Sequence, residues 1–210
     1  LEAQDRRDMS KTTDFLYQIE TSDIEISFDI RHRSIIDALP AYGNISTVLD
    51  VGCGHGAVPR TLQKQGYKVT GLDIERRSSW VDPQGVNFIE EDFMTSSALE
   101  SSYDVVICSE VIEHLPNYKS FYAKLLSMAT ERLIVTVPYE RSFDMSGPPP
   151  VGHCNYWSMG STSGFLSAGE FITMSRPYST SISKIRSKPR DVQMRQWCLM
   201  IVVDKRQSYG

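Results

Sequence analysis

The stretch LDVGCGHG, residues 49–56, decides the fold of this chain. In it, a short apolar run ends at Asp50 and leads into three alternate glycines, Gly52, Gly54 and Gly56. Such a run is typical of a buried parallel strand, and the glycines let the backbone turn tightly and approach a ligand without side-chain collision. The stretch therefore predicts a strand, a ligand-binding turn and a helix in succession.

Patterns typical of strands and helices alternate on both sides of this turn. Apolar residues at helical spacing predict one or two helices within 13–40, before the first strand at 46–52. Further strands are expected at 67–73, 86–92, 103–110, 132–138, 179–186 and 196–204, and helices at 57–65, 95–100, 117–129 and 167–174. The alternation predicts an α/β, Rossmann-like, doubly wound fold. Its seven-stranded sheet should be mostly parallel, with one antiparallel strand from a C-terminal hairpin.

Composition points to a single domain without bulk attraction for nucleic acid. The chain has 210 residues, 40% of them hydrophobic, which suffices for one full core. A net charge of −4 gives no general attraction for polyanions, although it leaves a local basic patch open. The basic residues near the C-terminus are interpreted as a solvated strand edge and loop. They are Lys184, Arg186, Lys188, Arg190 and Arg195.

Cysteine spacing and hydropathy bear on the compartment. The four cysteines, at 53, 108, 154 and 198, form no CxxC pair, so neither a zinc ribbon nor a disulfide framework is indicated. No apolar run approaches the roughly 20 residues that span a bilayer, and residues 1–12 lack the apolar core of a signal peptide. We expect a cytoplasmic protein whose first 12 residues form a flexible tail.

Two carboxylates flank the glycine turn and indicate the ligand. Asp73 ends the second expected strand, 23 residues after Asp50, where a carboxylate can accept hydrogen bonds from both hydroxyls of a ribose. Asp50, placed before the glycines, would repel a pyrophosphate but suits a cationic amino-acid group. The sequence therefore predicts a nucleoside cofactor that also carries an amino acid.

Three ordered motifs carry a family resemblance. VLDVGCGHG at 48–56, GLDI at 71–74 and EEDF at 90–93 resemble the motifs of the class I S-adenosylmethionine-dependent methyltransferases. The resemblance implies one methyltransferase domain over 1–210 with its cofactor-binding core at 45–140. It implies that Asp73 holds the ribose, that Ile74 packs on the adenine, and that Asp92 with Phe93 meets the adenine amino edge. The implied cofactor site is Asp50, Gly52, Gly54, Gly56, Asp73, Ile74, Asp92, Phe93, Ser109 and Glu110.

The stretch EVIEHL, residues 110–115, follows the fourth expected strand at the mouth of the cofactor crevice. Pro116 confines any helix there to a single turn, which can place Glu110, Glu113 and His114 on one side. Similar stretches line the floor of the methyl-transfer site in small-molecule methyltransferases. That interpretation is favoured over a metal site.

A second histidine, His153, stands in the loop PPPVGHCNYW at 148–157, at the same end of the sheet. Either His153 or His114 could be the base that removes a proton from a hydroxyl acceptor. We expect residues 139–175 to form an acceptor loop or lid. The expected acceptor pocket comprises Tyr17, Tyr139, Tyr156 and Trp157.

The predicted function is methyl transfer from S-adenosylmethionine to a small-molecule acceptor. CSEVIEH at 108–114 replaces the asparagine-proline-proline-tyrosine signature of enzymes that methylate planar nitrogens, which favours a hydroxyl or an aliphatic amine. A catalytically silent cofactor-binding partner subunit is the alternative of another class. The oligomeric state does not follow from the sequence.

The enzymatic alternative is a metal-dependent methyltransferase that modifies the 3′-terminal 2′-hydroxyl of small RNAs. By resemblance to that family, the metal ligands would be Glu110, Glu113, His114 and His153. The loop before His153 is shorter than in that family, and CNYWSMGSTSG at 154–164 lacks its charged run. No metal is therefore expected, and a nucleic-acid partner is not the favoured one.

Overall fold

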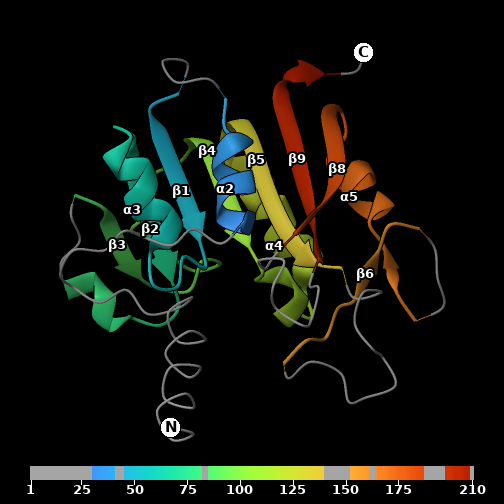
Figure 1. Cartoon of the computed structure of the whole chain (residues 1–210), viewed down its shortest axis with the longest axis horizontal. Coiled ribbons are helices and arrows are strands. Elements are labelled where there is room, and N and C mark those ends of the chain that lie inside the picture. Colours follow the sequence, from blue (N-terminus) through green and yellow to red (C-terminus); the bar gives the residue numbers. More distant parts are fainter. Residues whose placement is uncertain are drawn as a thin grey trace, which may run out of the picture.

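The computed structural model describes residues 30–40, 45–81, 85–139, 152–160, 164–186 and 197–208. These residues build a seven-stranded sheet with the strand order β3-β2-β1-β4-β5-β9-β8 (Figure 1). The strands are β1 (Thr47–Val51), β2 (Lys68–Asp73), β3 (Asn87–Glu90), β4 (Tyr103–Ser109), β5 (Ala129–Pro138), β8 (Tyr178–Arg186) and β9 (Trp197–Ser208).

The strand directions match the expectation from sequence. Strands β1 to β5 are mutually parallel, and β9 is antiparallel to both of its neighbours, β5 and β8. The carboxyl ends of the parallel strands therefore share one edge of the sheet, at the bottom of Figure 1. The end of β8 and the beginning of β9 lie at this same edge. The predicted α/β fold with one antiparallel strand is confirmed.

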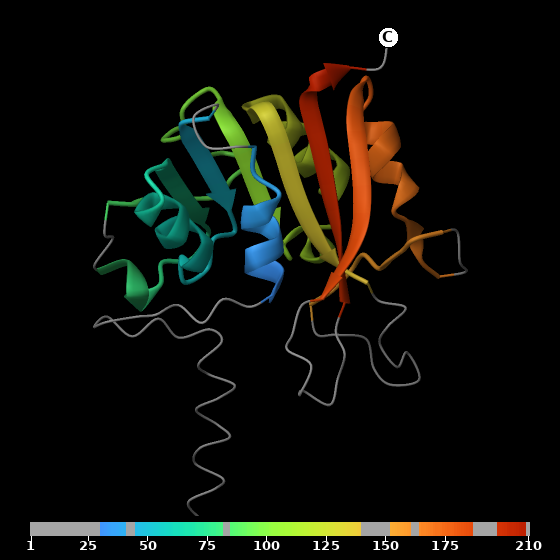
Figure 2. The same ribbon diagram turned by 45° about the horizontal axis from the view of Figure 1, so that its top comes forward.

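Helices cover both faces of the sheet (Figure 2). Helices α2 (Ile30–Asp37) and α3 (Ala57–Lys64) pack on one face, where Ile35 and Leu62 join a buried cluster with the sheet. Helices α4 (Tyr118–Met128) and α5 (Gly169–Met174) pack on the other face, through side chains such as Leu125 and Phe171. Because β4 is covered on both faces, Val105 to Cys108 are all fully buried, which explains its continuous apolar run.

Three local differences from the predicted elements have physical causes. The helix expected at 95–100 is absent, since this segment forms turns and bends. The Asp92 carboxylate accepts a hydrogen bond from the backbone of Met94 at 2.6 Å, and short polar side chains that bond nearby backbone compete with a helix. Strand β5 begins at Ala129, before the predicted 132. A small parallel sheet of β6 (Trp157–Ser158) and β7 (Leu166–Ser167) was not expected.

Two described connections contain 3₁₀ turns, η1 (Ser78–Val81) and η2 (Ile112–His114). The turn η2 is the single helical turn expected before Pro116. The helix predicted within 13–40 is described only over α2, and the tail at 1–12 lies outside the described residues. Among the described residues, no helix combines the length and apolar composition needed to cross a membrane. The boundaries proposed for the cofactor core and the acceptor loop stay predictions.

Candidate active site

The three glycines of the turn after β1 all have positive φ angles, of 74°, 51° and 82°. The backbone N–H of Gly52 donates to the carbonyl of Leu72 at 2.7 Å, and the N–H of Gly54 donates to Asp73 Oδ2 at 2.8 Å. Gly56 is the N-cap of α3. The turn is therefore fixed against the end of β2, in a conformation that favours glycine.

The glycines differ in what surrounds them. A Cβ atom on Gly52 would lie 2.2 Å from Val111 Cγ2, and one on Gly56 would lie 2.5 Å from the Phe88 ring. A Cβ atom on Gly54 would meet no heavy atom within 4 Å. Gly52 and Gly56 thus permit close packing within the protein. Gly54 instead borders open space, as a backbone that a ligand approaches must do.

Asp73 closes the turn with its carboxylate. Its Oδ2 accepts the Gly54 N–H and its Oδ1 accepts the N–H of Glu75 at 3.2 Å. Each carboxylate oxygen has two lone pairs, so both oxygens retain capacity to accept another hydrogen bond. The two backbone bonds also hold the carboxylate in one orientation. These residues fit a diol such as that of a ribose.

Asp50 lies beneath the turn and is almost fully buried. Burial, with a smaller contribution from the negative charge of Asp73, raises the pKa of Asp50 to about 7. Without a cation nearby, the ionised form is disfavoured, because a charge loses its hydration there. A cationic ligand group would favour ionisation of Asp50, as the amino-acid part of the predicted cofactor would.

Replacing Asp50 by asparagine should change how stability depends on pH. The native state holds the Asp50 proton up to about pH 7, whereas an unfolded chain releases it near pH 3.9. The stability of the cofactor-free protein should therefore fall as pH rises through this window, and Asp50→Asn should remove that fall. Thermal unfolding at about pH 5 and pH 8 tests this. If the melting temperatures of the wild type and Asp50→Asn differ by the same amount at both pH values, the prediction is contradicted.

The residues expected around the adenine differ in how exposed their side chains are. Ile74 is 73% exposed directly after β2, where it can pack on a ligand. The Phe93 side chain is buried in the core, with its ring 4.8 Å from that of Phe121. Any contact with the adenine edge therefore falls to Asp92 and to the backbone of Phe93, rather than to the Phe93 ring.

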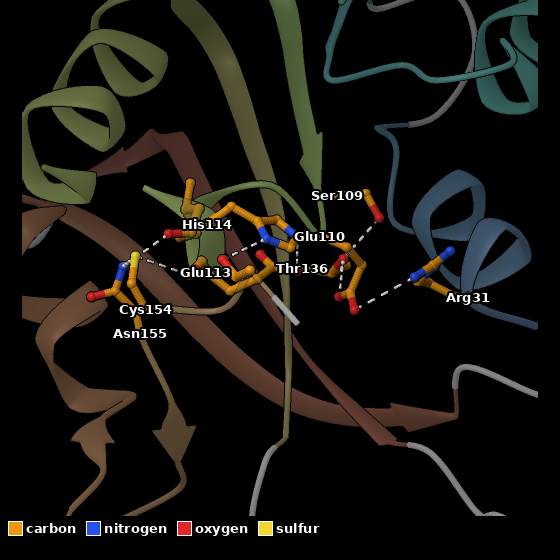
Figure 3. A network of polar contacts seen from close by, with 10 residues as sticks. Arg31, Ser109, Glu110, Glu113, His114, Thr136, Cys154 and Asn155 are labelled. Carbon is orange, nitrogen blue, oxygen red and sulfur yellow. Dashed lines mark hydrogen bonds and ion pairs between the residues drawn. The ribbon is translucent and has the colours of Figure 1, made fainter. Parts of the chain in front are cut away.

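Glu110 follows β4 with a φ angle of 55°, the one positive φ of a non-glycine residue in the described part of the chain. Its Oε2 lies 3.5 Å from Arg31 Nη1 and its Oε1 accepts the Thr136 hydroxyl at 3.0 Å (Figure 3). Because the Thr136 proton is used there, the Ser109 hydroxyl donates to Thr136 at 2.8 Å. Arg31 comes from α2, and no sequence signal pointed to it.

The turn η2 carries two further polar residues. Glu113 is 1% exposed, and its Oε1 lies 3.9 Å from His114 Nε2. His114 Nδ1 lies 3.0 Å from the carbonyl of Gly152. A carbonyl only accepts, so Nδ1 carries the proton and Nε2 of the neutral ring has a lone pair. The His114 and His153 rings meet edge to face at 4.8 Å between centroids.

The loop with His153 is tied to η2 by its backbone (Figure 3). The N–H groups of Cys154 and Asn155 both donate to the carbonyl of Glu113, at 2.8 and 3.1 Å. The Asn155 amide donates to the carbonyls of Leu115, at 2.7 Å, and Ile112, at 3.2 Å. Asn155 was missed from the sequence, although asparagine commonly satisfies free carbonyls at turn ends. It fixes the spacing between the two histidines.

Three of the four residues considered as metal ligands come together. Donor atoms of Glu113, His114 and His153 lie within 4.8 Å of one another. Two ligands about 2.1 Å from one ion can be at most about 4.2 Å apart, and the 3.9 Å between Glu113 Oε1 and His114 Nε2 meets that limit. Glu110 stands outside this group, because its carboxylate turns toward Arg31. Burial lowers the pKa of His153, opposed by the negative charge of Glu110.

The expected acceptor pocket is only partly assembled. Trp157 is fully buried against Tyr118 and Phe171, which makes it a core residue rather than a lining residue. Tyr139 is half-buried beside it, and Tyr17 lies outside the described residues. A hollow of about 330 Å³ does form beside Tyr156, whose ring centroid lies 6.3 Å from that of His153. Its described lining is Cys154, Asn155, Tyr156, Gly164, Phe165 and Leu166.

Comparison with known families agrees with this geometry. The chain matches the family model described as a methyltransferase domain over residues 2–183. It belongs to this methyltransferase family. The resemblance seen in the glycine turn, GLDI and EEDF is thereby confirmed.

Relatives of this methyltransferase include ubiquinone biosynthesis O-methyltransferases. That of Rickettsia felis is 39% identical over 109 residues, which are 46% of this chain and 43% of the relative. That of Rickettsia canadensis is 38% identical over 109 residues, 46% and 45% of the two chains. The chain thus spans less than half the length of the curated relatives it matches.

Solved structures show the same fold at low identity. The methyltransferase domain of bacterial CtHen1-CN is 20% identical with a TM-score of 0.56, covering 83% of this methyltransferase and 97% of that chain. The 1,6-didemethyltoxoflavin-N1-methyltransferase of Burkholderia thailandensis is 16% identical with a TM-score of 0.61, covering 95% and 86%. At this identity, the likeness concerns the fold alone.

Proposed function

We propose that this chain transfers a methyl group from S-adenosylmethionine to a small-molecule acceptor, at a hydroxyl or, less favoured, an aliphatic amine. The observation that carries the proposal is the pair of histidines. The rings of His153 and His114 lie 4.8 Å apart between centroids, and His114 belongs to η2, which follows β4. A base is required there when a hydroxyl becomes the acceptor.

The residues around the glycine turn would hold the cofactor. Asp73 would accept hydrogen bonds from the ribose hydroxyls, while Asp50 would face the amino-acid part. Gly54 would allow the backbone to approach the ligand. When bound, S-adenosylmethionine supplies the methyl group and, in its sulfonium, the leaving group. The protein then needs only to align the acceptor and remove its proton.

His153 is suited to removing that proton. Burial lowers its pKa, so the ring is neutral and able to accept a proton near neutral pH. The Glu110 carboxylate raises the same pKa more weakly, which means that it favours the imidazolium formed after proton transfer. The backbone bonds from Cys154 and Asn155 to η2 keep the ring beside His114.

The names of the relatives support oxygen as the methylated atom, since they are O-methyltransferases. The hollow lined by Tyr156 and Phe165 supports an acceptor of small size, because sites for small molecules have volumes of about 300–1,000 Å³. Tyr156 and Phe165 at its lining suit an acceptor with an aromatic or apolar part.

A methylation assay tests the proposal. The protein is incubated with S-adenosylmethionine labelled in the methyl group and with a panel of catechols, phenols and primary amines. We expect label in a hydroxyl-bearing acceptor, and none with Asp73→Ala at low cofactor concentration. A larger thermal shift with NAD than with S-adenosylhomocysteine would overturn the cofactor. Cofactor binding without turnover on the panel would favour the silent partner subunit.

A metal-dependent RNA methyltransferase is the second candidate, favoured by the grouping of Glu113, His114 and His153. We expect activity on a small acceptor to survive dialysis against a chelator, because Glu110 is engaged by Arg31 and Thr136 instead of joining the group. The assay is run with and without added Mn²⁺, and with Glu113→Ala. Activity that vanishes on chelation, returns with Mn²⁺ and is lost in the variant would support this candidate.

A further inference from the structure

A group of two cations and two aromatic rings lies at the same edge of the sheet, outside the site described above. Lys184 Nζ lies 4.3 Å from the centre of the Tyr139 ring and 4.6 Å from that of Trp197. The guanidinium carbon of Arg186 lies 5.1 Å from the Trp197 ring. Lys184 and Arg186 belong to the basic run interpreted from sequence as a solvated edge. At these two positions, the structure shows side chains that pack on aromatic rings.

Strand register places the four side chains on one face. Arg186 of β8 stands opposite Trp197 of β9, and Lys184 stands opposite Leu199. The Tyr139 N–H donates to the Trp197 carbonyl at 2.8 Å, which continues the same row across β5. Because side chains two residues apart along a strand share a face, Lys184 and Arg186 project from the same face, Lys184 beside both rings and Arg186 beside Trp197.

The two cations lack an acidic counterpart within the described residues. Several other basic side chains reach carboxylates, as Arg132 does to Asp204 at 2.6 Å and Arg206 does to Glu131 at 2.7 Å. The contacts described for Lys184 and Arg186 are with rings instead. A ring face orients a cation without neutralising it, so both charges stay available to an anion.

The group lies at the same edge of the sheet as the proposed methyl-transfer site, on strands that follow β4 in the strand order. Tyr139 follows β5, which pairs with β4, the strand that ends just before Glu110. Arg186 ends β8, two strands further along the order β5-β9-β8. With neighbouring strands about 4.8 Å apart, the strands that carry the group lie about 5 to 15 Å from β4 across the sheet. Lys184 reaches back to the Tyr139 ring on the near side of the group, so an acceptor needs to extend only to that side.

We propose that Lys184 and Arg186, oriented by Tyr139 and Trp197, form a subsite for an anionic group on the methyl acceptor. The group would be a carboxylate or a phosphate, since a guanidinium binds either through two parallel hydrogen bonds and an ammonium adds a point charge. This inference rests on the proposed function. It narrows the acceptor class to hydroxylated acids.

The test compares an anionic and a neutral acceptor. 3,4-Dihydroxybenzoate and its methyl ester have the same catechol and differ in charge. The preference for the acid is measured as kcat/KM for the acid divided by kcat/KM for the ester. Lys184→Ala/Arg186→Ala should reduce this ratio by about tenfold to a hundredfold, because KM for the acid rises. The matched control Lys64→Ala/Arg176→Ala removes two exposed charges elsewhere and should keep the ratio. If both double variants change the acid-to-ester ratio equally, the subsite is overturned.

Direct binding separates this inference from the proposed function. The affinities of 3,4-dihydroxybenzoate, 4-phosphocatechol and inorganic phosphate are measured by calorimetry with S-adenosylhomocysteine present, so that no turnover is needed. We expect weaker binding of the anionic catechols to Lys184→Ala/Arg186→Ala than to the control pair, with inorganic phosphate following the same order. If the two double variants bind the anionic ligands with equal affinity, the subsite is overturned even if methylation occurs. If Lys184→Ala/Arg186→Ala binds them more weakly than the control but no methylation is found, the result counts against the proposed function alone.

Discussion

Gly54→Ala should lose cofactor affinity by about a hundredfold or more while the protein stays folded. The new methyl group would point into the open space beside Gly54, where the ligand is expected, and it would meet no protein atom within 4 Å. The φ angle of 51° costs an alanine about 1–2 kcal/mol, a modest loss of stability. Titration with S-adenosylhomocysteine and thermal unfolding measure the two effects separately.

Gly52→Ala is the matched control, because it adds the same methyl group to the same turn. Its Cβ would lie 2.2 Å from Val111 Cγ2, so the backbone or Val111 must move. We expect a much larger fall in melting temperature than for Gly54→Ala. Normal affinity of folded Gly54→Ala for S-adenosylhomocysteine would show that this glycine does not face the cofactor.

His153→Ala should lower turnover by about a hundredfold or more and leave the affinity for S-adenosylhomocysteine almost unchanged. In the proposed function, the ring removes the acceptor proton and does not contact the cofactor. Because burial lowers the pKa of His153, wild-type activity on a hydroxyl should rise with pH through a midpoint below the ordinary value of about 6.5. That acid limb should be absent from the residual activity of the variant.

His114→Ala is the comparison for the second histidine. His114 is bonded to the Gly152 carbonyl and lies beside the buried Glu113 in η2, directly after β4, so we expect its loss to reduce both turnover and cofactor affinity. Normal turnover in His153→Ala, with the acid limb retained, would make His153 a structural loop residue. His114 would then be the candidate base.

The main elements of the fold were predictable because they depend on local patterns. The apolar runs at β1, β2, β4 and β5 identify strands that are buried on both faces, and parallel strands need crossover connections. The segment at 95–100 was predicted wrongly, since backbone bonding by polar side chains outweighed helix propensity there. The short sheet of β6 and β7 was also missed, as two-residue strands leave no periodic pattern.

The sequence by itself predicted the residues at the cofactor end of the site. Gly52, Gly54 and Gly56, with Asp50 before them and Asp73 at the next strand end, belong to one strand–turn–helix–strand unit. The geometry of such a unit follows from chain chirality and short connections. Spacing along the chain is therefore enough to predict which of these residues share a crevice.

Only the tertiary structure decided which side chains surround the proposed acceptor end. Arg31 meets Glu110 from 79 residues away, and His153 meets His114 from 39 residues away. Lys184 reaches the Tyr139 ring only because β9 enters the sheet between β5 and β8. These contacts depend on strand order, register and rotamers together, and no local pattern specifies them. Side chains from distant segments meet only when the whole sheet has formed.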